Sequence, residues 1–287
     1  MTVRASVLLV LLTTASPALA QAPLTFEVAS VRTVAASDTP TAALGVKIAG
    51  SQVRITALSM KDYLSYAFNV SPKQIAGPDW LAEARYDVTA NMPAGVDRDK
   101  IPVMLQELLR ERFQLEIRRE QREFPVYALT LARNGRKLTP STLKEVDASA
   151  PVEVTGSGGN NGVMMDLGGG SFFSLAADAI TARHLTMTDL VETLTRFVDR
   201  TVIDATGVTG RYDITVKLTR EEYDATLLRS AVNAGIRLPP QVLRALDGAP
   251  ANPVGPALEA AGLAFDSRRA PLDVIVVESL RREPLDN

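Results

Sequence analysis

The sequence contains no cysteine, and this absence excludes several kinds of chemistry together. Thiol nucleophiles, thiolate metal sites and disulfide bonds are ruled out, and we expect no cysteine-linked lipid anchor. Small secreted domains often depend on disulfide bonds, but a chain of 287 residues can bury enough apolar surface to fold without them. We therefore expect stability to come from a packed core.

The sequence also has few histidines and a small net charge. His184 is the only histidine, so a Ser-His-Asp triad or a histidine metal site would have to use it. The net charge of −2 gives no basic excess for binding nucleic acid or an anionic membrane. The glycines of residues 156–170 lack the Lys-Ser/Thr of a phosphate-binding loop, and no loop has the alternating Asp/Asn of a calcium site. We expect no catalytic residue, no metal and no cofactor.

Long apolar runs are missing except near the N-terminus. Arg4 precedes the apolar run Val7 to Leu12, and Ala18-Leu19-Ala20 is typical of a signal-peptide cleavage site. The run is too short to cross a bilayer, which takes about 20 apolar residues. The sequence therefore predicts a signal peptide over residues 1–20 and an exported protein, periplasmic or extracellular, with no membrane span after cleavage.

What the sequence does contain is a repeat, in residues 54–131 and 179–277. The first copy reads Ile55-Thr56-Ala57-Leu58-Ser59-Met60-Lys61-Asp62. The second reads Ile180-Thr181-Ala182, then two extra residues, Arg183 and His184, on a predicted surface turn, and then Leu185-Thr186-Met187-Thr188-Asp189. Further on, each copy has Arg-Tyr-Asp before a β-branched strand, at Arg85 to Asp87 and at Arg211 to Asp213. These matches predict an internal duplication.

Each copy is predicted to form a β-α-β-β-α-β-β unit. Ser59 and Thr186 each precede a helical pattern and have an Asp three residues later, which is typical of a capping box. Residues 113–117 and 126–132 are predicted to form a closing hairpin, and residues 263–265 and 272–277 a final one. The fold class is then α+β, with two homologous units, mainly antiparallel sheets and helices packed on one face.

The composition suggests where these units begin and end. We expect the first unit at residues 21–138 and the second at residues 171–287. Residues 139–170 are rich in Gly and Ser and predict a linker or a long exposed hairpin. Residues 220–254 interrupt the second copy and are predicted to be an insertion, with short helices near 223–232 and 241–246.

The paired Arg-Tyr-Asp motifs are candidates for ligand binding, through Arg85, Asp87, Arg211 and Asp213. A pseudo-symmetric site could use both arginines, in a cleft between the units that the insertion also borders. The alternative is structural: Tyr packs inward, while Arg and Asp flank it on the solvent side of a strand and form cross-strand pairs.

Two further residues are single candidates. Trp80 is the only tryptophan and could stack on a sugar or on a partner's side chain, or it could plug a loop against the sheet. Asp204, in Asp204-Ala205-Thr206-Gly207, superficially resembles the Asp-Thr-Gly of aspartic proteases, but the spacing differs by one residue and the first copy has no equivalent. A turn stabilised by this carboxylate is the alternative.

Several sequence segments resemble those of one family of uncharacterised exported proteins associated with soil bacteria. The matching segments are Phe26 to Arg32, Gly77-Pro78-Asp79-Trp80-Leu81, Arg85-Tyr86-Asp87, Met104 to Phe113, Pro125 to Leu129, Val202 to Asp213 and Glu283 to Asn287. The resemblance implies a domain of unknown function, found alone or fused to membrane metallopeptidase sensors of the antirepressor type. It implies no catalytic residues.

The resulting hypothesis is a non-catalytic ligand-binding or protein-interaction module of the cell envelope. Its partner would be an envelope protein or a small molecule. The alternative is an envelope or extracellular hydrolase that uses carboxylates in the cleft between the two units.

Overall fold

A computed structural model describes residues 23–35, 44–133, 138–144, 151–156, 162–176, 178–234, 236, 238–248 and 250–285. The predicted signal peptide lies outside these residues. The elements up to the long strand β6 are β1 (Val28–Val34), β2 (Leu44–Ala49), β3 (Gln52–Ser59), α1 (Met60–Phe68), η3 (Pro72–Gln74), β4 (Ile75–Ala76), α2 (Trp80–Glu83), β5 (Arg85–Asn91), η4 (Arg98–Lys100), α3 (Ile101–Phe113) and β6 (Glu116–Leu131).

The remaining elements begin with three strands in the Gly/Ser-rich region. They are β7 (Thr139–Pro140), β8 (Val152–Gly156), β9 (Val163–Gly168), β10 (Ser171–Ala176), β11 (Ala179–Leu185), α4 (Met187–Leu194), β12 (Thr201–Asp204), β13 (Tyr212–Lys217), α5 (Arg220–Asn233), α6 (Pro240–Asp247), α7 (Gly255–Ala260) and β14 (Leu263–Ser279). The α+β prediction is confirmed, and the helices predicted near 223–232 and 241–246 are α5 and α6.

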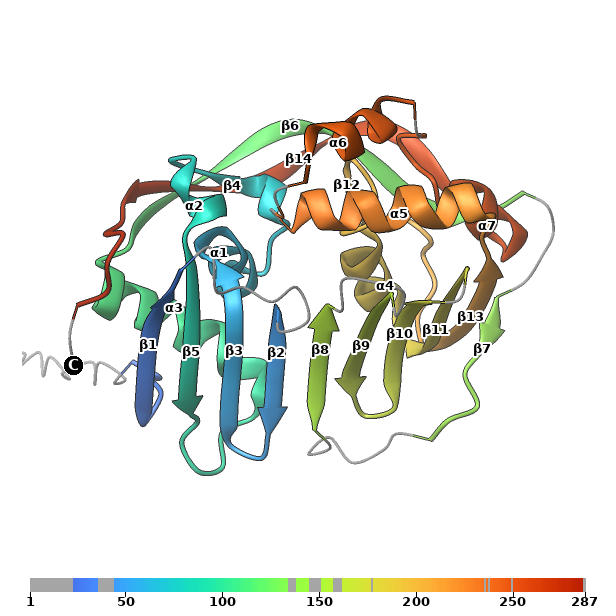
Figure 1. The fold of residues 1–287 in the computed structure, drawn as a ribbon. Helices are drawn as coiled ribbons and strands as arrows, with labels where there is room; N and C mark the ends of the chain where they lie inside the picture. The colour runs from blue at the N-terminus through green and yellow to red at the C-terminus, as the bar shows by residue number, and fades with distance from the viewer. Residues whose placement is uncertain are drawn as a thin grey trace, which may run out of the picture.

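A ten-stranded antiparallel sheet runs through the whole molecule, in the order β1-β5-β3-β2-β8-β9-β10-β11-β13-β7 (Figure 1). The strands β2 and β8 join its two halves, with Ile48 opposite Val152. Residues 139–170 therefore do not form only a linker: their described part contains β7, β8 and β9, and β8 and β9 lie in the middle of this sheet. Composition alone did not show this, because the pairing partners are far away in the sequence.

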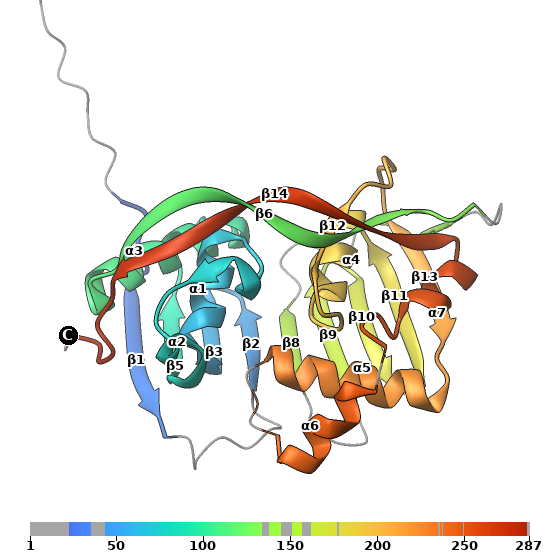
Figure 2. The same ribbon diagram turned by 90° about the horizontal axis from the view of Figure 1, so that it is seen from above.

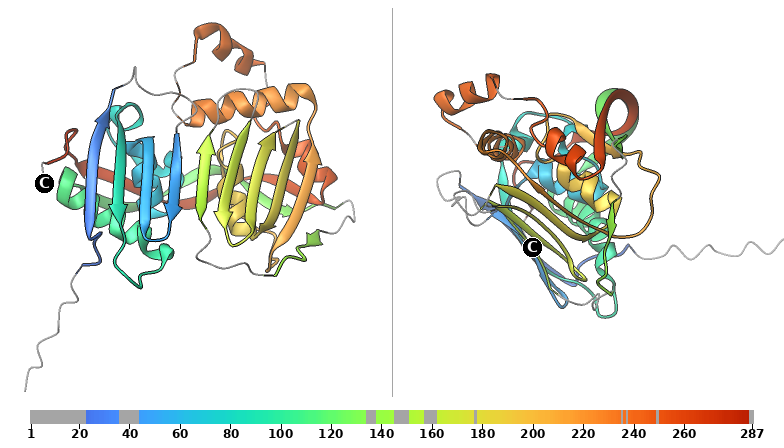
Figure 3. Two further views of the ribbon diagram at one scale, coloured as in Figure 1. Left: turned by 60° about the horizontal axis from the view of Figure 1, so that its bottom comes forward. Right: turned by 90° about the vertical axis from the view of Figure 1, so that its right-hand side faces the viewer.

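A second sheet has four strands, in the order β12-β6-β14-β4. Its two central strands, β6 and β14, pair antiparallel along almost their full length and cross over both halves as a twisted ribbon (Figure 2). The short strands β12 and β4 add in parallel, β12 beside the end of β6 and β4 beside the end of β14. Helices α1 and α4 lie between the ribbon and the ten-stranded sheet (Figures 2 and 3).

The two predicted hairpins are wrong. Residues 116–131 do not fold back, and neither do residues 263–279: each segment is one strand, β6 or β14, and the two pair with each other. Phe113, predicted to lie in a strand, is the last residue of α3. The physical reason is the absence of turn residues, since the middle of β6 reads Arg118-Arg119-Glu120-Gln121-Arg122-Glu123, with no Gly or Asn to supply positive φ. Each half thus has one strand fewer than the predicted β-α-β-β-α-β-β order.

Each half has its own core, and the ribbon exchanges strands between them. The first core contains Ile275 of β14, which is fully buried beside α1 and α3 residues such as Leu64 and Leu105. The second core contains Tyr127 and Leu129 of β6. The chain enters β6 from the first half, and β6 completes the second core. It enters β14 from the second half, and β14 completes the first core.

The helix starts agree with the sequence. Ser59 and Thr186 are N-caps whose side chains accept from the backbone N–H of Asp62 and Asp189, and the reciprocal bonds of the capping box are also present. Gly262 follows α7 with φ 93°, as expected for a residue after a helix end.

Helix α3 ends with a residue that is strained by its side chain. Gln114 is its C-cap, with φ 51° and ψ 47°, and its side chain is exposed. We expect Gln114→Gly to raise the free energy of unfolding by about 1 kcal/mol, because glycine adopts this left-handed conformation without a Cβ penalty. Thermal unfolding would show a melting temperature higher by about 2–4 °C. The control, Arg110→Gly inside the same helix, is expected to lower it; an unchanged or lower value for Gln114→Gly contradicts the prediction.

Candidate functional site

The first Arg-Tyr-Asp motif holds a bulge in the neighbouring strand. The pairing of β3 with β5 shifts register between Ile55 and Leu58, and Ala57 there has φ 52°. The Asp87 carboxylate (Oδ1) accepts from the Ala57 N–H at 2.8 Å, and Arg85 Nη1 donates to the Ala57 carbonyl at 2.9 Å. The two side chains thus satisfy both backbone groups that the bulge removes from the strand ladder.

The second motif does the same in β11. His184 has φ 53°, its N–H donates to Asp213 Oδ1 at 2.8 Å, and its carbonyl accepts from Arg211 Nη1 at 3.0 Å. Arg211 Nη1 also lies 2.9 Å from Ser171 Oγ, which itself donates to the His184 carbonyl. In both halves, then, the arginine and the aspartate contact the backbone of the adjacent strand.

This geometry corrects the placement of His184. His184 lies two residues before the cap Thr186, as Ala57 does before Ser59, so Arg183 and His184 are not an insertion but occupy the positions of Thr56 and Ala57. The side chain is 4% exposed, not on a surface turn. Its Nδ1 lies 3.1 Å from Ser141 Oγ, but its Nε2 has no hydrogen-bond partner among the described residues. The carboxylate that would orient the ring in a triad is therefore missing there.

The two motifs are far apart. The strands β5 and β13 that carry them are separated by seven strand-to-strand steps in the ten-stranded sheet, or roughly 34 Å at about 4.8 Å a step. Arg85 and Arg211 therefore do not border one cleft. Residues 220–254, predicted to be an insertion, do approach Arg85: its Nη2 donates to the carbonyl of Ala234 at the end of α5 at 3.1 Å.

The other two candidates have structural contacts. Trp80 begins α2, is half-buried and packs against the first core. Asp204 Oδ1 accepts from both the N–H of Thr206 at 2.9 Å and its hydroxyl at 2.7 Å, in an exposed turn. A ligand-binding role for Trp80, Asp204 and the four motif residues stays a prediction.

A cluster of charged residues lies where the two halves meet. Lys73 Nζ of η3 donates to the Val198 carbonyl at 2.9 Å, and Tyr127 OH donates to Asp199 Oδ1 at 2.9 Å. The Arg200 guanidinium lies 5.0 Å from the centre of the Tyr127 ring. These groups contact one another and the backbone. Asp199 is the single carboxylate in these contacts, whereas a carboxylate dyad requires two carboxylates. The cluster therefore holds the halves together.

Lys73 gives this junction a predicted pH dependence. Burial lowers the pKa of Lys73 to about 8, against the opposing effect of Asp199. Because the unfolded chain keeps this proton up to about pH 10.5, its contribution to stability should rise from pH 8 to pH 10. Urea unfolding of the wild type and of Lys73→Met at pH 7.5, 8.5 and 9.5 tests this: the wild type should gain stability relative to the variant as pH rises. A constant or falling difference contradicts it.

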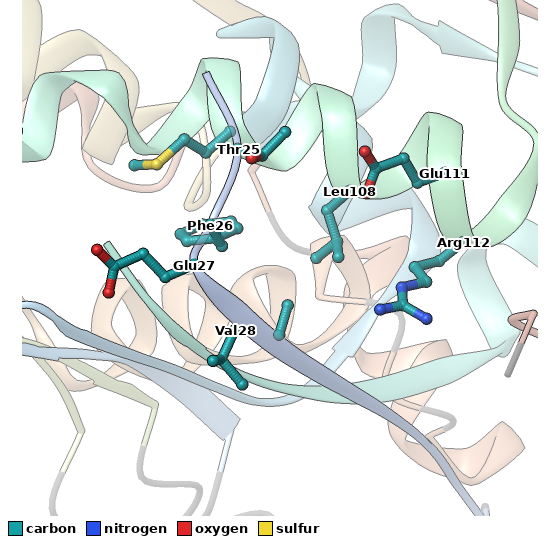
Figure 4. A pocket seen from close by; sticks show the side chains of 9 residues that line it. Thr25, Phe26, Glu27, Val28, Leu108, Glu111 and Arg112 are labelled. Carbon is teal, nitrogen blue, oxygen red and sulfur yellow. The ribbon is translucent and has the colours of Figure 1, made fainter. Parts of the chain in front are cut away.

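The described residues also form a groove, between the start of β1 and one face of α3. Its volume is about 230 Å³, and it is lined by Thr25, Phe26, Glu27, Val28, Ala29, Met104, Leu108, Glu111 and Arg112. Figure 4 shows the Arg112 side chain extending from α3 into the space between the helix and β1. Phe26, Met104 and Leu108 form a buried apolar floor, while Val28 is 63% exposed.

The charged side chains of the groove are what make it a candidate site. Glu27, Glu111 and Arg112 have no side-chain hydrogen bond or ion pair to any other described residue, whereas Arg110 on the same helix pairs with Glu107. An apolar floor with a few unpaired polar groups is typical of a binding site. This groove was not among the sites predicted from the sequence. One signal was present in the sequence. Glu111 and Arg112 continue the helical spacing of Met104 and Leu108, so charged residues replace apolar ones on this face over the last turn of α3.

The structure is thus that of an α+β protein with mainly antiparallel sheets and a small groove at one sheet edge. Among the described residues, no helix is both long and apolar enough to cross a membrane, and no group of three or more His, Asp or Glu is placed to hold a metal ion. A family model described as protein of unknown function (DUF3738) matches residues 61–280. The chain belongs to this family.

The match confirms the resemblance to a family of unknown function. The association with soil bacteria and with sensor fusions stays a prediction. Neither a curated protein nor a solved structure matches the chain significantly.

Proposed function

We propose that the protein is an exported, non-catalytic module of the cell envelope that binds a small ligand or a partner protein in the groove between β1 and α3. Export rests on the signal-peptide pattern of residues 1–20. The observation that carries the binding function is the groove itself, in which three unpaired charged side chains surround an apolar floor. Unpaired charges beside a buried apolar surface favour a ligand that supplies both kinds of contact.

We also propose that the architecture arose by internal duplication. Two units, at residues 21–138 and 171–287, would each place helices on one face of a sheet and exchange strands through the β6–β14 ribbon. The matched capping boxes at Ser59 and Thr186 and the matched bulges at Ala57 and His184 support this. The groove belongs to the first unit alone, so it would be a feature that one copy gained and the other did not.

A thermal-shift screen tests the binding function. Residues 21–287 would be screened against peptides, peptidoglycan fragments, sugars and antibiotics. A ligand at 100 times its dissociation constant stabilises the folded state by about 2.7 kcal/mol, which raises the melting temperature by roughly 5 °C or more. We expect at least one class to give a saturable shift.

Two groove variants locate the site. Arg112→Ala and Glu111→Ala, tested separately, should weaken the shift for a ligand bound in the groove, whereas Arg110→Ala on the same helix turn should not, because Arg110 does not line the groove. A shift that all three variants reproduce in full places the ligand elsewhere and overturns the assignment to this groove.

A further inference from the structure

The four sheet edges among the described residues differ in how they are protected. The outer strand β7 is two residues long and contains Pro140, β4 is two residues long, and β12 is four. The remaining outer strand, β1, is seven residues long and has no proline. It pairs with β5 without a register shift, from Val28 opposite Asn91 to Val34 opposite Arg85.

Exposed strand edges invite pairing with another chain, and proteins usually block them with short strands, proline, lysine or bulges. The edges at β7, β4 and β12 carry such protection, in length or in proline. The edge of β1 carries a single charged residue, Arg32, and the most exposed of the large apolar side chains, Val28 at 63%. The stretches of β6 and β14 that β12 and β4 do not cover are also open edges, but they are rich in charged residues and contain Pro125 and Pro271. The β1 edge is therefore less protected against pairing than these edges.

The groove lies where the side chains of a further strand would go. The end of α3 extends past the outer side of β1 (Figures 1 and 3). A strand added about 4.8 Å beyond β1 would point every second side chain toward this part of α3. There it would meet Leu108 and Phe26 at the floor and Glu111 and Arg112 at the rim. The open edge and the groove are therefore two parts of one surface.

We propose that this surface is a strand-addition site: an extended segment of another protein pairs with β1 as an eleventh strand and places an apolar side chain in the groove. The backbone edge of β1 supplies affinity, and the groove supplies selectivity. The rim carries two carboxylates, Glu27 and Glu111, against one guanidinium, so it favours a segment with a basic residue near the apolar one. This partner class rests on the proposed function above, because it uses the same groove.

Selection from a displayed library of ten-residue peptides on residues 21–287 would find such segments. We expect selected peptides to combine an apolar residue with a Lys or Arg two positions away. Hydrogen exchange should then slow at alternate amides of β1, because successive N–H groups of a strand point to opposite edges and the inward set already bonds to β5. The slowing should be tenfold or more at saturation.

N-methylation of the peptide provides a control that leaves the protein unchanged. Methylating one set of alternate amides should abolish binding, because it removes the hydrogen bonds to β1, while methylating the other set should have little effect. Arg112→Ala and Glu111→Ala should change which peptides are selected, and Arg110→Ala should not.

The outcomes separate this inference from the proposed function. If the groove variants change ligand binding, but bound peptide does not slow exchange in β1 and binding does not depend on which peptide amides are methylated, strand addition is wrong while groove binding stands. If the protein forms a dimer that itself protects the outer amides of β1, a second copy occupies the edge and the inference is overturned. If no ligand responds to the groove variants, the proposed function fails first.

Discussion

Truncation after Pro271 is expected to unfold the first half of the molecule, although the cut lies near the C-terminus. It removes the part of β14 that pairs with residues 116–122 and with β4. Ile275 on this strand is fully buried in the first core. Removing the strand leaves that core open on one side, and the loss of packing should exceed the roughly 5–15 kcal/mol by which a domain is stable.

Trp80 makes the effect easy to observe. It is the only tryptophan, and it packs against the first core, so its fluorescence reports on the first half alone. The truncated chain should show the emission of a solvent-exposed tryptophan. A synthetic peptide of residues 272–285, added in excess, should restore the buried emission. Truncation after Glu283, which leaves β14 complete, is the control.

The point-mutation version of this experiment is Ile275→Ala. It should lower the free energy of unfolding by about 2–5 kcal/mol through the cavity it creates. If the truncated protein instead keeps a cooperative urea transition followed by Trp80, the first core does not need β14.

Asp87→Ala is expected to lower the free energy of unfolding by about 1–3 kcal/mol, which is large for a partly exposed residue. Its carboxylate accepts the hydrogen bond from the N–H of Ala57. Because Ala57 is 2% exposed, water cannot replace the carboxylate as the acceptor. The substitution therefore leaves a buried donor unsatisfied next to a residue with φ 52°. Thermal unfolding should show a melting temperature lower by about 2–4 °C for each kcal/mol.

The matched variants identify the cause. Asp87→Asn keeps an oxygen acceptor in the same place and should lose much less. Asp213→Ala should repeat the effect in the second half, through the N–H of His184. Thr89→Ala, an exposed change on the same strand, should be nearly neutral. Equal losses for Asp87→Ala and Asp87→Asn would show that the carboxylate's charge, and not the hydrogen bond, matters.

Local sequence signals predicted the local structure well. Residues a few positions apart set the Ser59 and Thr186 capping boxes and the strands of the Arg-Tyr-Asp motifs, and all of these are present. The same signals could not predict the β6–β14 ribbon. Segments with strand character were visible in both regions, but which segments pair is decided by tertiary packing between residues far apart in the sequence.

The motifs illustrate the limit for function. Repetition made Arg85, Asp87, Arg211 and Asp213 conspicuous, yet their contacts are to the backbone of a bulge, which depends on strand pairing that no sequence window contains. The groove was missed for the opposite reason. Its lining comes from two segments, around Phe26 and around Leu108, that have no pattern in common and meet only because β1 forms the edge of the sheet.

The crossing ribbon also has a consequence for the order of folding. The first core lacks Ile275 until nearly the whole chain has been made, so the N-terminal half cannot reach its final state early in synthesis. Pairing β6 with β14 closes a very long loop, and contacts of such wide sequence separation slow folding. For a protein exported as proposed, this delay would keep the first half unfolded, and able to be threaded across a membrane, until the last strand emerges.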